Sequence, residues 1–122
     1  MKKIVTILII AIIIYFVYIN QIHNKPSLKI SISEARSKRF GVIIDVRTPK
    51  ERDQLGYYPN SVPISMENIR NQVPLDIPSK NTHILVYSGD NRAFVAANTL
   101  YIMGYPNVKY ITESYIRLMP GY

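Results

Sequence analysis

The 122-residue chain contains no cysteine. It therefore forms no disulfide bond, and the absence does not reveal the redox state of its compartment. It also lacks a thiolate of its own, the polarisable nucleophile that ionises near neutral pH and attacks sulfur readily. Any sulfur chemistry on this chain would need a thiol from another molecule.

Histidine is scarce as well. The only two, His23 and His83, are far apart and the carboxylates are scattered, so no metal-ligand spacing occurs and we expect no metal or cofactor. A serine nucleophile needs a positioned base. His23 falls in a predicted linker and His83 at the start of a predicted strand, so neither is expected to activate a serine.

The N-terminal run from Ile4 to Ile19 is apolar apart from Thr6 and carries no charge. Extended through Ile22, it becomes long enough to cross a bilayer. No small-residue cleavage site of the kind that ends a secretory signal follows it. We therefore interpret residues 1–22 as a retained single-pass membrane anchor and 23–28 as a linker, with a cleaved signal as the alternative.

Acidic residues are few, 8 against 15 lysines and arginines, and the net charge is +7. No nucleic-acid-binding motif organises the basic residues, so we expect no nucleic-acid partner. Basic residues after the anchor could attract anionic lipid headgroups or form an ordinary solvated surface. They follow the anchor, whereas Lys2 and Lys3 precede it, so the positive-inside rule gives two conflicting orientations. We expect the domain on the cytoplasmic side. These residues are Lys25, Lys29, Arg36, Lys38 and Arg39, with only Glu34 opposing them.

Residues 29–122 suffice for one compact domain. Capping-box patterns at Ser31/Glu34 and Thr48/Glu51 mark two helix starts. The predicted strands cover 29–32, 42–46, 62–64, 84–87 and 107–111, and the predicted helices 35–38, 49–54, 66–71, 93–103 and 114–118, with a loop over 75–81. This alternation predicts a doubly wound α/β domain with a mainly parallel, five-stranded sheet.

Two polar segments directly follow the two most apolar strands. They are Asp45-Val46-Arg47 and the loop from Ser88 to Arg92. Ligands bind at the carboxyl ends of parallel strands, and a helix N-terminus beside Arg92 would favour an anion. The alternative is that Asp90 or Asn91 caps the helix and Arg92 is solvated.

The order and spacing of several segments over residues 29–122 resemble those of rhodanese domains. Residues 42–51 are similar to the strand and D-V-R-x-x-x-E opening of that family, and residues 56–64 to its G-H-x-P-G-A-x-x-I segment, with Tyr57 in place of histidine. The helix ending before Gly104 and the segment Asn107 to Ile111 resemble the helix, glycine and strand that follow the active loop. The resemblance implies the rhodanese fold.

Active rhodaneses carry a C-x-x-G-x-R loop whose cysteine accepts sulfur as a persulfide. Here the loop is one residue short. Counted from the strand, Ser88 takes the cysteine position; counted back from Arg92, Tyr87 does. Glu113-Ser114 also replaces a late glycine pair. The resemblance therefore implies a domain without sulfurtransferase activity that binds or scaffolds a protein partner.

In this interpretation the former pocket is lined by the loop and by Tyr57 and Tyr58. Asp45, Arg47 and Glu51 support it. The loop residues are Ser88, Gly89, Asp90, Asn91 and Arg92. Two alternatives remain: a sulfurtransferase component that uses a partner's thiol, and a sensor that binds a small anion through this loop.

Overall fold

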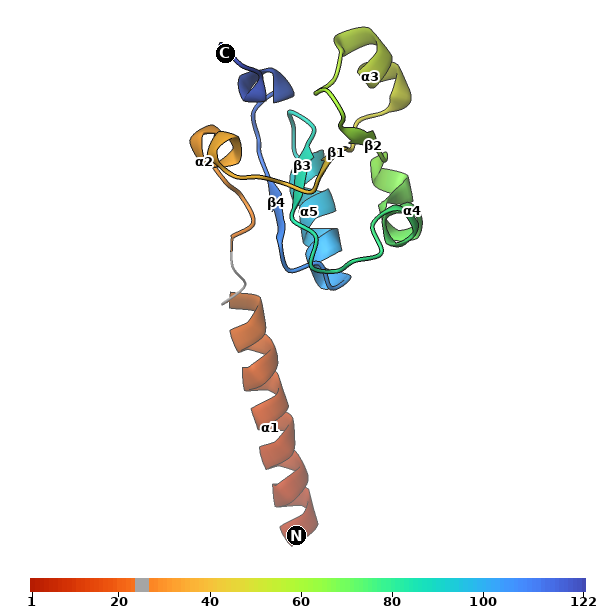
Figure 1. The fold of residues 1–122 in the computed structure, drawn as a ribbon. Coiled ribbons are helices and arrows are strands. Elements are labelled where there is room, and N and C mark those ends of the chain that lie inside the picture. Colours follow the sequence, from red (N-terminus) through yellow and green to blue (C-terminus); the bar gives the residue numbers. More distant parts are fainter. Residues whose placement is uncertain (24–26) are drawn as a thin grey trace.

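The computed structural model describes residues 1–23 and 27–122 (Figure 1). The first element is the helix α1 (Lys2–His23), 22 residues long. At about 1.5 Å per residue it measures about 33 Å, close to the ~30 Å hydrocarbon thickness of a bilayer. Its segment Lys2–Asn20 has a mean hydropathy of 2.3 and none of it is buried. By length and composition α1 could cross a membrane. A signal sequence would have the same length and composition. Residues 24–26 of the predicted linker, including Lys25, lie outside the described residues.

A parallel sheet forms the centre of the domain. Its strands β1 (Val42–Asp45), β2 (Val62–Pro63), β3 (Ile84–Tyr87) and β4 (Val108–Tyr110) lie in the order β2-β1-β3-β4. Ile44 is opposite Val62 on one side and Val86 on the other. The apolar sequence of β1 and β3 suits central strands that are covered on both faces. The predicted α/β class with a parallel sheet is confirmed.

The predicted strand over 29–32 is the main difference from expectation, because the sheet of the described residues has four strands rather than five. That segment contributes one bridge, between Lys29 and Tyr110. The amide of Ile30 donates to Tyr110 O at 3.0 Å, and the amide of Tyr110 donates to Leu28 O at 3.0 Å. Ser31 is the N-cap of the next helix and Ile32 is already helical, so the chain leaves the extended conformation after Ser31.

The helices begin where their caps predict. Ser31 caps α2 (Ile32–Ser37), and a complete capping box between Thr48 and Glu51 starts α3 (Pro49–Leu55). The 3-10 turn η1 (Met66–Asn68) leads into α4 (Ile69–Asp76). The helix α5 (Arg92–Ile102) follows β3, and the 3-10 turn η2 (Tyr115–Leu118) follows β4.

The helix α4 runs past the predicted start of the 75–81 loop, despite Pro74 within it. Proline removes one backbone donor. The turn still closes beyond it, because the amide of Ile77 donates to Val73 O at 2.7 Å.

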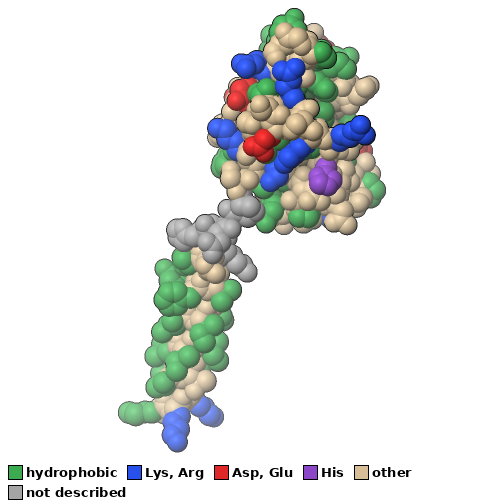
Figure 2. All heavy atoms as spheres, turned by 60° about the vertical axis from the view of Figure 1, so that its left-hand side comes forward, with side chains coloured by type: hydrophobic (Ala, Val, Ile, Leu, Met, Phe, Trp, Pro, Cys, Tyr) green, Lys and Arg blue, Asp and Glu red, His purple; other side chains and the backbone are tan. Residues whose placement is uncertain are grey.

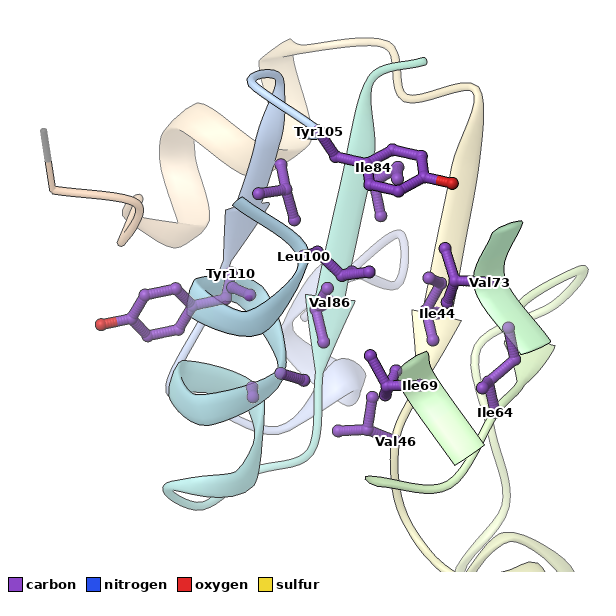
Figure 3. Close-up of a cluster of buried hydrophobic side chains, with 14 of the residues drawn as sticks. Ile44, Val46, Ile64, Ile69, Val73, Ile84, Val86, Leu100, Tyr105 and Tyr110 are labelled. Carbon is purple, nitrogen blue, oxygen red and sulfur yellow. The ribbon is translucent and has the colours of Figure 1, made fainter. Parts of the chain in front are cut away.

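Helices pack on both faces of the sheet, and the strand residues alternate between them. Ile84 and Val86 point into a core formed with α4 and α5, which Figure 3 shows in close-up. Leu85 and Tyr87 point into a second, smaller core formed with α2 and η2. The alternation is the two-residue period of a strand. Since α2 and η2 are short, they cover the second face of the sheet less completely. The carboxyl ends of β1 and β3 meet at one edge of the sheet.

Candidate functional site

The loop after β3 closes on the hydroxyl of Ser88. Its Oγ accepts hydrogen bonds from the amides of Asp90 at 3.2 Å and Ala93 at 2.9 Å, and donates one to Asp90 O at 2.9 Å. Gly89 adopts a φ of +80°, a left-handed conformation that favours glycine. The serine hydroxyl therefore lies at the centre of its own loop and accepts a hydrogen bond from a backbone amide in the first turn of α5.

The side chains that cap α5 are those of Asp90, one of the two residues considered in the sequence, and Ser88. Asn91 occupies the N-cap position but makes no side-chain cap hydrogen bond. Asp90 Oδ1 accepts from the amide of Arg92 at 3.0 Å, and Ser88 Oγ accepts from the amide of Ala93. Because Tyr87 is the last residue of β3 and is fully buried, Ser88 is the first residue of the loop itself.

Arg92 is held by two carboxylates rather than left free for a ligand. Its guanidinium donates to both oxygens of Glu51, at 2.6 and 2.7 Å, and to Asp90, at 2.8 to 3.0 Å. These hydrogen bonds from Arg92 lower the pKa of Glu51 to about 2 and the pKa of Asp90 to about 2. They also raise the pKa of Arg92. The loop is thus clamped to α3, and its positive charge is compensated.

A second ion pair lies beneath this clamp at the end of β1. Asp45 Oδ1 accepts from the amide and Nε of Arg47 at 3.0 and 2.9 Å, and Oδ2 accepts from its terminal nitrogen at 2.9 Å. Burial alone would raise the pKa of Asp45, but the hydrogen bonds from Arg47 outweigh it and lower that pKa. Arg47 also donates to Gly56 O at 2.6 Å, which fixes the loop after α3.

Sequence reasoning missed Arg52 and Ser61, and it did not foresee that Tyr87 and Tyr58 would join this network. The Tyr87 hydroxyl donates to Asp45 Oδ2, shares a hydrogen bond with Ser61 Oγ, and accepts from the amide of Tyr58, each at 3.1 Å. Arg52 donates to Asp45 at 3.2 Å and to Ser61 at 2.9 and 3.0 Å. A buried carboxylate such as that of Asp45, at the end of a strand, needs several hydrogen-bond partners. That requirement is the sequence signal that could have predicted these partners.

A pocket of about 320 Å³ opens between the loop, α3 and η2. Six of the predicted residues line it: Arg47, Glu51, Ser88, Gly89, Asp90 and Arg92. Leu55, Tyr87, Ser114, Tyr115 and Ile116 complete the lining. Two arginines face two carboxylates in this pocket, so its formal charges balance.

The structure places the other predicted residues outside the pocket. Asp45 lies behind it, bonded to Arg47, and Asn91 is exposed at the start of α5. Tyr57 is half exposed, and its ring lies 3.9 Å from the guanidinium of Arg52. Tyr58 packs against the second core instead. Tyr115 takes a position at the pocket, with its ring centre 5.3 Å from the guanidinium of Arg47.

The chemistry open to this pocket is narrow. It contains no thiol, because the chain has no cysteine. His83 precedes β3, whereas Ser88 follows it, so the strand separates them by roughly 16 Å at ~3.3 Å per residue. Within residues 1–23 and 27–122, no group of three or more His, Asp or Glu could hold a metal ion. What remains is a neutral, partly apolar cavity with a rigid, hydrogen-bonded floor.

Comparison with known proteins assigns this arrangement to a family. A family model described as "Rhodanese-like domain" matches residues 29–116. A rhodanese from E. coli, solved with anions, is 26% identical, with a TM-score of 0.54, covering 57% of this chain and 81% of its own. The single-domain sulfurtransferase RDL2 of Saccharomyces cerevisiae is 16% identical, with a TM-score of 0.59, covering 78% and 90%. The Helicobacter pylori protein hp1203 is 23% identical, with a TM-score of 0.62, covering 75% and 81%. The curated proteins include no match.

Proposed function

The chain belongs to the rhodanese-like domain family, and from its lack of cysteine we propose that it is a catalytically inactive member serving as a membrane-anchored binding module. The observation that carries the proposal is the chemistry at Ser88. This residue stands at the start of the loop that holds the sulfur-accepting cysteine in active rhodaneses. A hydroxyl neither ionises near neutral pH nor forms a persulfide.

The environment of Ser88 supports the same conclusion. Its hydroxyl is 2.9 Å from both Asp90 O and the amide of Ala93, so its donor and acceptor capacity is used within the loop. His83 lies before β3, at the opposite end of that strand from Ser88, so it is not placed to remove the proton of Ser88. Serine catalysis therefore lacks both a free nucleophile and a base.

An anion sensor is less well supported than a protein-binding role. Arg92 is the residue that would bind an anion, and it already pairs with Glu51 and Asp90. An incoming sulfate would have to displace one of these carboxylates from the guanidinium and would meet the repulsion of both. The second alternative, a component that uses a partner's thiol, has no residue in the pocket that favours it.

The direct test is a thiosulfate:cyanide sulfur-transfer assay on the full chain in lipid nanodiscs. We expect no thiocyanate above the rate in buffer. An active rhodanese in the same nanodisc preparation serves as the positive control. Turnover by the wild-type chain that grows in proportion to protein concentration would refute the proposal of inactivity.

The anchor is the second part of the proposal. The unburied apolar surface of α1 supports it, and so does the lack of a small-residue cleavage site. When it is expressed with a C-terminal tag, the protein should stay in the membrane fraction after alkaline extraction. Intact-mass spectrometry should show that it retains Met1. A shortened, soluble product would identify α1 as a cleaved signal instead.

The cytoplasmic orientation can be tested cleanly because the chain has no competing thiol. We would introduce Asp53→Cys at an exposed site on α3 and treat sealed cells with a membrane-impermeant maleimide. A cytoplasmic domain is labelled only after the membrane is opened. Labelling of intact cells would show that the domain lies on the outer side of the membrane.

A further inference from the structure

The thinly covered face of the sheet carries a groove that the former active site does not use. Two adjoining pockets, of about 500 and 390 Å³, lie beside α2, the start of β1 and the turn before β2. Both are lined by Phe40, Ile43, Tyr58 and Pro120. We call this surface the basic groove. Each pocket is within the size range of natural binding sites.

The floor of the basic groove is apolar because the helices on this face are too short to cover it. The helix α2 ends at Ser37, and η2 is a single turn. Phe40, Ile43 and Tyr58 are consequently only partly buried, although all three pack against the second core. Aromatic and aliphatic surface that remains partly hydrated gains free energy when a partner covers it.

The rim of the groove carries more basic than acidic side chains. Arg36, Lys38 and Arg39 line the larger pocket, and neither pocket has an acidic lining residue. Of these three, Lys38 pairs with Glu34 at 3.9 Å and Arg36 donates to Tyr122 O, whereas Arg39 has no ion-pair partner among the described residues. Figure 2 views the domain from the side of α2 and shows Lys and Arg outnumbering Asp and Glu on this face. The former active site, by contrast, balances its charges internally.

One contact ties this rim to the last residues of the chain. Arg36 donates from a terminal guanidinium nitrogen to the main-chain oxygen of Tyr122 at 2.8 Å. The chain reaches that contact through a turn, in which Gly121 has a φ of +87° and the amide of Tyr122 donates to Met119 O at 3.3 Å. Pro120, within this turn, lines both pockets. This turn therefore forms one wall of the groove and leaves the apolar floor beside it partly exposed.

From these features we infer that the basic groove binds an acidic segment of a partner protein, with apolar side chains in the pockets and carboxylates on the rim. A concave, apolar floor fits protruding side chains, whereas a layer of lipid headgroups would leave the floor uncovered. Complementary charge would accelerate and orient the encounter. The inference rests on the proposed binding function and assigns it a surface and a class of partner.

The experiment uses phage that display random short peptides, selected on the full chain in phosphatidylcholine nanodiscs. We expect selected peptides enriched in Asp or Glu next to Phe, Leu or Met. The best peptide is then synthesised with a fluorescent label, and its dissociation constant is measured by anisotropy. The double variant Arg36→Glu, Arg39→Glu should bind it at least about tenfold more weakly, and Arg39→Lys should bind it normally.

Arg70→Glu is the matched control, since Arg70 is an exposed arginine on α4, which covers the opposite face of the sheet. It should change the dissociation constant by less than about twofold. If the double variant unfolds, the single variant Arg39→Glu, which leaves the Arg36–Tyr122 contact intact, replaces it.

Selection of no peptide, selection of peptides without acidic residues, or equal binding by wild type and charge-reversed variant would each overturn the inference. So would loss of peptide binding in nanodiscs containing phosphatidylserine with recovery at high salt, because the groove would then face the membrane. Failure of these binding measurements leaves the sulfur-transfer assay unaffected. The two proposals can therefore fail separately.

Discussion

Replacing Arg92 with methionine should destabilise the domain and change how its stability depends on pH. Methionine keeps the aliphatic part of the side chain and removes the guanidinium. That group binds Glu51 on α3 and Asp90 within the loop. Without it, Glu51 keeps its hydrogen bonds from Thr48 and Asp90 keeps that from the amide of Arg92, but both carboxylates lose their ion-pair partner.

The size of the effect follows from the exposure of the three groups. Arg92 and Glu51 side chains are each 31% exposed, and that of Asp90 is 51% exposed. Fully exposed ion pairs contribute about 0.2–1 kcal/mol, and hydrogen bonds to charged groups about 1.5–3 kcal/mol. Because the clamp lies between these cases, we expect a loss of about 1–2 kcal/mol. For a domain of this size the midpoint of thermal unfolding should fall by about 5–15 °C.

The pH dependence gives the prediction a second, independent readout. Arg92 lowers the pKa values of Glu51 and Asp90 to about 2, from ordinary values of 4.5 and 3.8. A carboxyl group with a lowered folded pKa contributes its full stabilisation above its unfolded pKa and loses it as the pH falls through the folded one. The wild type should therefore lose stability between about pH 4.5 and pH 2. The Arg92→Met variant should lose less over this range, because both pKa values rise when the guanidinium is removed.

Urea unfolding of the full chain in detergent micelles, followed by the near-ultraviolet circular dichroism of the buried tyrosines, measures both quantities. Arg70→Met is the control, an exposed arginine without an ion pair among the described residues, and should stay within about 0.5 kcal/mol of wild type. An Arg92→Met curve that coincides with wild type at neutral pH and keeps its acid slope would refute the clamp.

Three further predictions concern the same network. Tyr87→Phe leaves Asp45, Ser61 and the Tyr58 amide short of a buried partner and should cost about 1–3 kcal/mol in the same urea assay; a cost within error of zero would exclude the hydroxyl as a structural hub. Thr48→Ala removes the α3 capping box and should cost about 1 kcal/mol, whereas Thr48→Ser should restore most of it; equal stability of both variants would contradict the role of the cap. Titration with sulfate, phosphate or thiosulfate should give no saturable thermal shift, and a shift that Arg92→Met abolishes would instead establish an anion site.

Much of the fold could be predicted because its strongest determinants are local. The unbroken apolar sequences of β1 and β3 indicated central strands, and the Thr48/Glu51 pattern forms the expected reciprocal hydrogen bonds. The predicted strand at 29–32 shows the limit of such patterns. It overlapped the helix that Ser31 caps. Because Ile32 is already helical, the extended segment is shorter than predicted, and it forms a single bridge at Lys29.

The candidate site was harder to predict because its partners come from distant segments. The charge of Arg92 was evident in the sequence, but the position of Glu51, 41 residues earlier, opposite its guanidinium depends on the parallel pairing of β1 with β3. The same register brings the Tyr87 hydroxyl to Asp45. An isolated arginine at a helix start suggests an anion site, whereas the assembled network neutralises it. Tyr57 was placed at the pocket by resemblance, but it stacks on Arg52 instead.

The central claim, that this rhodanese-like domain has no group able to accept sulfur, can be tested by intact-mass spectrometry. The purified full chain is incubated with excess thiosulfate, freed of reagent and weighed beside an untreated sample. We predict identical masses. A stoichiometric gain of one sulfur atom, removed again by cyanide, would contradict the account.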